Sequence, residues 1–200
     1  MNPPYIDFAS AQNNYRRQHG GGNGQPIARA IGLKTYGLPL QVIDATAGLG
    51  QDAFVLAYLG CKVTLIERSP IIYDLLQDAL QRGAIHPEIK NYIANMHLIN
   101  ADAREVLQNL PAEQFPDVVY LDPMFPEREK TALVKQELRF LKTTVGEDLD
   151  ADQLLDLARN TAKRRIVVKR PRLAQYLNNA TPHSSQLGKA NRFDIYIPKT

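Results

Sequence analysis

The stretch that decides the fold runs from Val42 to Phe54 and reads VIDATAGLGQDAF. A short apolar run ends in an acid, a tight glycine turn follows, and a helical pattern begins at once. This order is typical of a buried parallel strand, a ligand-binding loop and the next helix. Gly48 and Gly50 lack a Cβ, so the backbone there can approach a ligand closely. Because open α/β sheets bind ligands at the carboxyl ends of their strands, we expect an adenosine-bearing cofactor at this loop.

Strand and helix patterns alternate along nearly the whole chain. We expect strands at about 41–45, 62–66, 97–100, 117–121 and 165–169. We expect helices at about 25–34, 51–59, 70–82, 86–96, 102–110, 127–145 and 151–163. Two short segments at the end, 184–187 and 192–197, have the pattern of a hairpin. The sequence therefore predicts a doubly wound α/β fold whose mostly parallel sheet ends in an antiparallel C-terminal edge hairpin.

The boundaries of two helices are marked by capping residues. Ser69 precedes Pro70, which favours a helix start at Pro70, and Gly83 is expected just beyond the end of that helix. Asp102, with Glu105 three residues on, resembles a capping box. The first of these helices carries an apolar stripe. The stripe consists of Ile71, Ile72, Leu75, Leu76, Ala79 and Leu80.

The chain is divided at about residue 36. Residues 1–36 form an N-terminal segment with glycines at 20–22 and 24 and one short helix, and residues 37–200 form the main domain. The glycines exclude a helix interior and predict a mobile loop. Arg16 and Arg17 beside it could contact phosphate, although a plain flexible connector has the same composition.

Composition excludes several classes of protein. The single cysteine, Cys61, excludes an internal disulfide and a Cys-rich zinc site, and we expect it to be an inert core thiol and the protein to need no metal. No secretory signal and no membrane-spanning run is visible, so a cytoplasmic protein is expected. The sequence does not fix the oligomeric state.

The net charge of +3 hides an asymmetry. Residues 1–124 carry 9 Lys and Arg against 12 Asp and Glu, whereas residues 125–200 carry 15 against 9. A basic half indicates a polyanionic partner, although a merely solvated helix face would look the same.

The glycine loop alone leaves the cofactor open. Residues 48–53 satisfy G-x-G-x-x-A and Glu67 ends the next strand, as in a nicotinamide-binding domain. Three features favour another cofactor. Asp44 would repel a pyrophosphate but attract a cationic amino-acid moiety, and Asp52 in the first helical turn suits a positive or hydroxyl-bearing ligand. The fourth strand ends in Asp-Pro-Met-Phe (122–125), which has no obvious place in hydride chemistry.

S-adenosylmethionine fits all three features. The Glu67 carboxylate, which only accepts hydrogen bonds, would bind the ribose hydroxyls. Arg68 would pack on the adenine face. Asp102 would reach the adenine amino group next to the Ala103 backbone, while also capping its helix.

The motifs together resemble a known family. Residues 42–50 are similar to motif I of Rossmann-like class I methyltransferases, and residues 122–125 resemble their Asp/Asn-Pro-Pro-Tyr/Phe motif, which marks methylation of planar exocyclic or amide nitrogens. With Gly-Gly-Gly-Asn-Gly-Gln (20–25), Val-Val-Lys-Arg-Pro (167–171) and Arg-Phe-Asp-Ile-Tyr (192–196), the chain resembles the bacterial small-subunit ribosomal RNA guanine-N2 methyltransferases of the RsmJ type from about residue 7 to 197.

This resemblance implies the donor, the acceptor and a set of cofactor residues. The donor would be S-adenosylmethionine and the acceptor a guanine amine in 16S ribosomal RNA, on the RNA or the small ribosomal subunit. Gln51 replaces an arginine of the family, and Asp102-Ala103 replaces a pair of small hydroxyl residues. Family members carry more chain before the glycines, which predicts a short or missing N-terminal substrate-binding portion. The implied cofactor residues are Gln51, Asp52, Glu67, Arg68, Asp102, Ala103 and Asp122.

The same resemblance gives the residues at 122–125 catalytic roles. Asp122 and the Pro123 carbonyl would accept from the guanine amine, and Phe125 would stack on the extruded base. A plain strand-ending turn is the alternative. Basic residues that follow the fourth and fifth strands would hold RNA phosphates. They are Arg128, Lys130, Lys135, Arg139, Lys169, Arg170 and Arg172.

Other functions remain open at this point. A methyltransferase acting on DNA adenine or a protein amide would share the Asp-Pro-Met-Phe motif, a nicotinamide-dependent oxidoreductase would share the glycine loop, and a non-catalytic ribosome-assembly factor would share the basic half.

Overall fold

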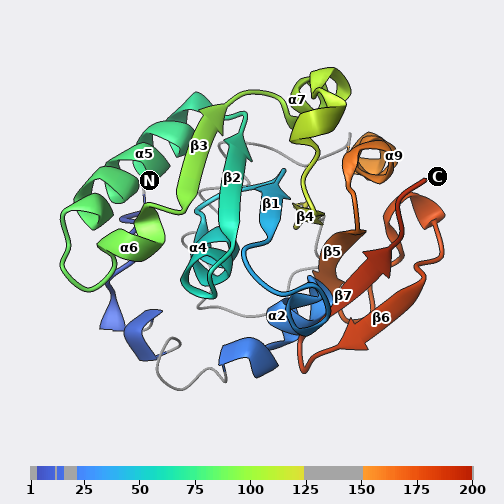
Figure 1. The fold of residues 1–200 in the computed structure, drawn as a ribbon, viewed down its shortest axis with the longest axis horizontal. Helices are drawn as coiled ribbons and strands as arrows, with labels where there is room; N and C mark the ends of the chain where they lie inside the picture. Colours follow the sequence, from blue (N-terminus) through green and yellow to red (C-terminus); the bar gives the residue numbers. More distant parts are fainter. Residues whose placement is uncertain (1–3, 12, 16–21, 124–150, 200) are drawn as a thin grey trace.

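The computed structural model describes residues 4–11, 13–15, 22–123 and 151–199. Its seven-stranded sheet has the order β3-β2-β1-β4-β5-β7-β6 (Figure 1). The strands are β1 (Gln41–Asp44), β2 (Lys62–Glu67), β3 (Met96–Asn100), β4 (Val118–Leu121), β5 (Arg165–Pro171), β6 (Ser184–Leu187) and β7 (Asn191–Tyr196). The first five pair in parallel, whereas β7 pairs antiparallel with both β5 and β6. The predicted doubly wound sheet with its antiparallel C-terminal hairpin is confirmed.

Helices and apolar side chains cover both faces of the sheet. On one face, side chains of α2 (Pro26–Ala30), α3 (Leu33–Tyr36), α4 (Gln51–Tyr58) and α5 (Pro70–Ala84) pack with alternate residues of the strands. On the other face, α7 (Ala103–Asn109) and α9 (Ala151–Thr161) lie side by side over the remaining strand residues (Figure 1). The described part also contains three short helical turns, η1 (Gly22–Gly24), η2 (Ala112–Gln114) and η3 (Leu177–Asn179), and the short helix α6 (Lys90–Ile93).

Several predicted helices have different limits. The helix expected over 25–34 is two short helices, because Gly32 between them has a φ of 77°. The helix expected over 86–96 shrinks to α6, and the one expected over 127–145 lies outside the described residues.

The predictions for α5 are partly wrong. The helix starts at Pro70 after Ser69 as expected, but Gly83 lies inside it rather than beyond its end. A Cβ at Gly83 would lie 2.8 Å from Ile93 Cγ1, so the glycine allows α6 to pack closely. Ile71, assigned to the apolar stripe, is 54% exposed, whereas Ile72, Leu76 and Ala79 are buried.

Cys61 is confirmed as a core thiol. It is fully buried, and this burial, together with the charge of Asp117, raises the pKa of the thiol to about 12. No helix in the described ranges combines the length and the apolar character that crossing a membrane requires.

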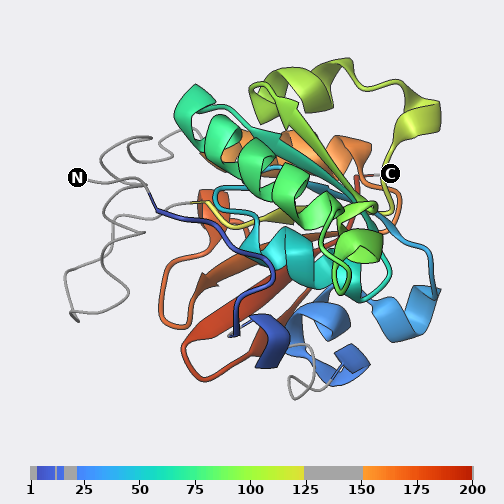
Figure 2. The same cartoon turned by 90° about the vertical axis from the view of Figure 1, so that its left-hand side faces the viewer.

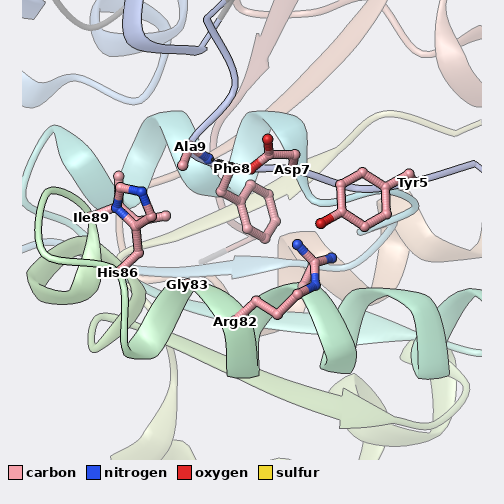
Figure 3. Close-up of a pocket in the computed structure, with 9 residues that line it drawn as sticks. Tyr5, Asp7, Phe8, Ala9, Arg82, Gly83, His86 and Ile89 are labelled. Atoms are coloured by element: carbon pink, nitrogen blue, oxygen red, sulfur yellow. Dashed lines mark hydrogen bonds between the residues drawn. The ribbon is translucent and has the colours of Figure 1, made fainter.

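The N-terminal segment packs against α5. Arg82 of α5 donates from Nη2 to the Ile6 carbonyl over 2.7 Å, and its guanidinium lies 4.4 Å from the centre of the Tyr5 ring. A cavity of about 380 Å³ lies beside these residues and is also lined by Phe8 and His86 (Figure 3). Figure 3 shows the Arg82 side chain reaching from the helix toward Tyr5.

Candidate active site

Three neighbouring parallel strands bring the predicted acids to one edge of the sheet. β1 lies between β2 and β4, and β4 lies next to β5. Asp44 pairs in register with Tyr120, and Leu121 with Val168. The residues that follow these pairs, among them Asp122 and Lys169, therefore meet at the carboxyl edge, beside the glycine loop.

Asp122 is held from its backbone and from its side chain. Its N–H donates to Thr46 Oγ1 over 2.6 Å, and its Oδ2 accepts from Lys169 Nζ over 2.9 Å. The carboxylate is still 40% exposed, so it can reach a ligand. Pro123 follows it and is buried, while Phe125 lies outside the described residues.

Lys169 joins Asp122 to a second carboxylate. Its Nζ lies 2.7 Å from Asp52 Oδ2, which also accepts a 2.7 Å hydrogen bond from the Tyr120 hydroxyl. Burial lowers the pKa of Lys169, but the charges of Asp122 and Asp52 outweigh it and hold the pKa above its usual value. Burial, with the charge of Asp52 beside the hydroxyl, raises the pKa of Tyr120. The lysine is therefore a charged bridge and Tyr120 a neutral donor.

Asp44 lies behind this cluster, where it is 2% exposed. Burial raises the pKa of its carboxyl to about 8, against the hydrogen bond from the Thr46 N–H and with the nearby charges of Asp52 and Asp122. Its negative charge, which the sequence predicted to attract a cation, is thus weakened at neutral pH.

Glu67 ties the glycine loop to the end of β2. Its Oε2 accepts from the Gly48 N–H over 3.0 Å and its Oε1 from the Ser69 N–H over 2.8 Å. Gly48 and Gly50 have φ values of 51° and 70°, which confirms the tight turn, and Gly50 caps the start of α4. Among the described residues, a Cβ at Gly48 would have only the Thr46 carbonyl, at 4.0 Å, as a neighbour, so the loop is open toward them on this side.

The remaining predicted cofactor residues follow β2 and β3 or, in the case of Gln51, begin α4. Asp102 caps α7 by accepting from the Arg104 N–H over 2.8 Å, and its side-chain hydrogen bonds with Arg104 lower the pKa of the carboxyl. Ala103 is buried, Arg68 is half-buried and Gln51 is exposed at the first turn of α4. The capping role of Asp102 is confirmed, and its role toward adenine stays a prediction.

Two of the predicted phosphate ligands need correction. Arg170 is 1% exposed and donates from Nη2 to the Gln175 carbonyl, because its position on β5 directs it into the protein. The Lys169 ammonium binds the carboxylates of Asp52 and Asp122 instead of extending outward from the surface. Arg172 is exposed. Arg128, Lys130, Lys135 and Arg139 lie outside the described residues, as do Arg16 and Arg17.

Sequence reasoning missed two residues of this site, Tyr120 and Thr46, and gave a third, Lys169, a different role. Lys169, Tyr120 and Thr46 hold Asp52 and Asp122 in place. A signal for this role of the lysine existed, because parallel neighbours run toward the same edge and Lys169 lies near the end of β5, the strand beside that of Asp122. Nothing in the pattern distinguished Tyr120 from an ordinary core aromatic.

The polar groups of the site match the hydrogen-bonding groups of S-adenosylmethionine. Acceptor carboxylates at Glu67 and Asp102 suit hydroxyl and amino donors, and the open Cβ position at Gly48 lets a ligand approach the backbone. Nowhere in the described part of the chain, the site included, are three His, Cys, Asp or Glu side chains placed to hold a metal ion.

Fold and site together define a class I S-adenosylmethionine-dependent methyltransferase. The family model described as putative SAM-dependent methyltransferase matches residues 1–198. A crystal structure of a SAM-dependent methyltransferase from Neisseria gonorrhoeae is 40% identical, with a TM-score of 0.78, over 99% of this chain and 76% of that one. A putative methyltransferase from Escherichia coli, 14% identical over 100% of this chain and 93% of that one, shares the fold with a TM-score of 0.56.

The sequence relatives are more specific. Ribosomal RNA small subunit methyltransferase J of Aeromonas salmonicida is 53% identical over 194 residues, which are 96% of this chain and 77% of that protein. The protein of the same name from Laribacter hongkongensis is 53% identical over 193 residues, 96% of this chain and 68% of that protein. The chain belongs to the ribosomal RNA small subunit methyltransferase J family.

Proposed function

We propose that this protein transfers a methyl group from S-adenosylmethionine to the exocyclic N2 of a guanine in 16S ribosomal RNA, in the cytoplasm. The observation that carries the proposal is the position of Asp122 beside the glycine loop, where Thr46 holds its backbone N–H, Lys169 holds its carboxylate and Pro123 follows it. The names of the relatives support ribosomal RNA of the small subunit as the acceptor.

The acceptor amine is a poor nucleophile because its lone pair is delocalised into the ring. Asp122 and the Pro123 carbonyl would accept from the N2 hydrogens and turn the lone pair out of the ring. Proline has no N–H of its own to compete for these acceptors. The fixed position of Asp122 supports this role, since its backbone and its carboxylate are both restrained.

Positive charge would develop on N2 as the methyl group passes from sulfur to N2 and leaves a neutral thioether, and it would disappear when N2 releases a proton to water. The Asp122 carboxylate would stabilise that charge in a site partly shielded from water. Phe125 would stack on the extruded base, an interaction of roughly 1–3 kcal/mol. Alignment of amine and methyl group would lower the barrier by up to about 7–11 kcal/mol.

The cofactor supplies an electrophilic methyl group on a sulfonium when it is bound. Glu67 would hold its ribose hydroxyls and Asp102, with the Ala103 backbone, its adenine. Arg68 would lie on the adenine face. Gln51, Asp52 and Asp44 would surround the amino-acid end. The position of Glu67 between Gly48 and Ser69 supports this arrangement.

Contacts to RNA phosphate would come from the basic residues after β4 and β5. They are Arg128, Lys130, Lys135, Arg139 and Arg172. Binding through them releases counterions, so the affinity for small-subunit RNA should fall steeply with rising salt. An affinity that stays flat from low to moderate salt would contradict this assignment.

The proposed function is tested by measuring methyl incorporation into four acceptors: isolated small ribosomal subunits, the RNA purified from them, DNA, and protein. Mass spectrometry of the nucleosides should find N2-methylguanosine. Asp122→Ala should lower kcat by about 10²- to 10³-fold while the fold persists. The control is Asp156→Asn, an exposed acid on α9 that pairs with Lys199. Methyl transfer to DNA or protein alone would overturn the proposal, and a folded wild type with no transfer to any acceptor would favour an assembly factor.

A further inference from the structure

A cavity of about 280 Å³ adjoins the acid cluster on the side of the C-terminal hairpin. Its lining combines Pro26 and Ile27 of α2 with Asn191 and Phe193 of β7, and Asp52 and Lys169 belong to it as well. Both views show α2 lying against β7 (Figures 1 and 2). Small-molecule sites have volumes of roughly 300–1,000 Å³, so the cavity suits a single small ring system.

The lining has two chemical characters. Ile27 and Phe193 are 2% and 8% exposed and offer apolar surface. Asp52 and Lys169 offer charge at the end nearest Asp122. A planar base with an apolar face and a polar edge matches this division, because pockets of this kind combine apolar walls with a few placed polar groups.

Lys169 can still donate a hydrogen bond in this cavity. Its ammonium has three hydrogens, and its contacts among the described residues use two of them, on Asp52 Oδ2 and Asp122 Oδ2. The side chain is 22% exposed, so the third hydrogen is within reach of a ligand. Two carboxylates fix the ammonium, so little freedom is lost when the third bond forms.

We propose that this cavity is the subsite for the acceptor base and that Lys169 determines the choice of guanine. Asp122 accepts from the guanine amine while Lys169 donates to guanine O6. Adenine presents an amino group, a donor, where guanine presents O6, so the ammonium rejects it. This inference rests on the proposed function and deepens it, since it names the residue that reads the base.

The first test combines a variant with a substrate analogue. After the methylated nucleotide is mapped, an RNA carries either guanine or 2-aminopurine there; the analogue keeps the N2 amine and lacks O6. Wild-type enzyme should prefer guanine by about 10- to 100-fold in kcat/KM. Lys169→Met should show little preference for guanine. The control, Lys199→Met, changes an exposed lysine that pairs with Asp156 and should keep the wild-type preference. An equal preference in wild type and Lys169→Met overturns the proposal.

Binding provides a readout that does not need activity. The Kd of the two RNAs is measured with S-adenosylhomocysteine present, and the guanine preference should again disappear in Lys169→Met. Failure of wild type to methylate guanine N2 at all would count against the proposed function, whereas a preference independent of Lys169 would count only against this inference.

The cavity itself is tested by filling it. Ala190→Trp, on the exposed β6–β7 turn, should abolish methylation without changing the affinity for S-adenosylhomocysteine. The matched control is Ala112→Trp. Ala112 lies on the exposed turn η2, which precedes β4 and so lies at the amino ends of the parallel strands, away from the carboxyl edge that carries the acid cluster. Unchanged kcat/KM in Ala190→Trp would place the base elsewhere.

Discussion

The backbone N–H of Asp122 donates a 2.6 Å hydrogen bond to Thr46 Oγ1. This bond joins the loop after β1 to the turn after β4. In the proposed reaction, the loop after β1 binds the cofactor, and the turn after β4 carries the carboxylate that contacts the acceptor amine. A side chain on the first therefore sets the position of the second.

Replacing Thr46 by valine should lower kcat by about 10- to 100-fold, because the shape stays and the acceptor for the Asp122 N–H is lost. Steady-state kinetics on small-subunit RNA measures it, and the affinity for S-adenosylhomocysteine should not change. Thr46→Ser keeps the oxygen and is the control. Activity lost in the serine variant but kept in the valine variant would mean that the methyl group, not the hydrogen bond, matters.

Glu67→Gln should weaken S-adenosylhomocysteine binding by about 10- to 100-fold, because two backbone N–H groups and the ribose rely on a charged acceptor. Gly48 and Ser69 donate to its two oxygens, and an amide nitrogen in place of one oxygen cannot accept. Calorimetry measures the Kd. Glu88→Gln, an exposed acid before α6, is the control. Undiminished affinity would remove Glu67 from the cofactor site.

The sequence was informative wherever a local pattern specifies a local structure. Apolar runs followed by an acid predicted β1, β2 and β4 and placed Asp44, Glu67 and Asp122 at one edge, as the strand order confirms. Glycines at 48 and 50 predicted the turn, because few other residues adopt its positive φ.

Local patterns gave wrong predictions where packing between distant segments determines the structure. Gly83 reads as a helix end, yet it continues the helix because Ile93 of α6 fills the space beside it. Arg170 reads as a surface cation, yet β7 and the residues after β5 enclose it. Lys169 reads the same way, and only the neighbouring strands reveal that it bridges two carboxylates.

Stability should depend on pH through Asp44. Burial raises the pKa of this carboxyl to about 8 in the folded protein, so the folded state binds more protons than the unfolded chain between about pH 4 and 8. The contribution of this group is therefore present in acid and is lost as the pH rises through 8. Between pH 6 and 8 the loss should be about 2 kcal/mol.

Asp44→Asn isolates that contribution, because asparagine does not titrate. Urea unfolding at pH 6 and pH 8 should show a smaller fall in the free energy of unfolding for the variant than for wild type. Asp78→Asn, whose side chain is 62% exposed on α5, should behave as wild type. The same pH slope in Asp44→Asn and wild type would contradict the raised pKa.

The two loop glycines should differ in how much an added methyl group destabilises the protein. Both have positive φ, so alanine costs about 1–2 kcal/mol at either position. At Gly50 the Cβ would also lie 2.8 Å from Leu76 Cδ1 and 3.2 Å from Phe8 Cζ. At Gly48 the Thr46 carbonyl, at 4.0 Å, is the one neighbour that the described residues provide. Gly50→Ala should therefore lose about 2–4 kcal/mol in all.

Urea unfolding of both variants at one pH measures the difference, and each serves as the other's control. Since a methyl group at Gly48 points into the open side of the loop, Gly48→Ala should weaken S-adenosylhomocysteine binding more than its small loss of stability explains. If Gly48→Ala were the less stable variant, the steric difference between the two glycines would be contradicted. If Gly48→Ala bound as wild type does, the open side of the loop would not be where the cofactor lies.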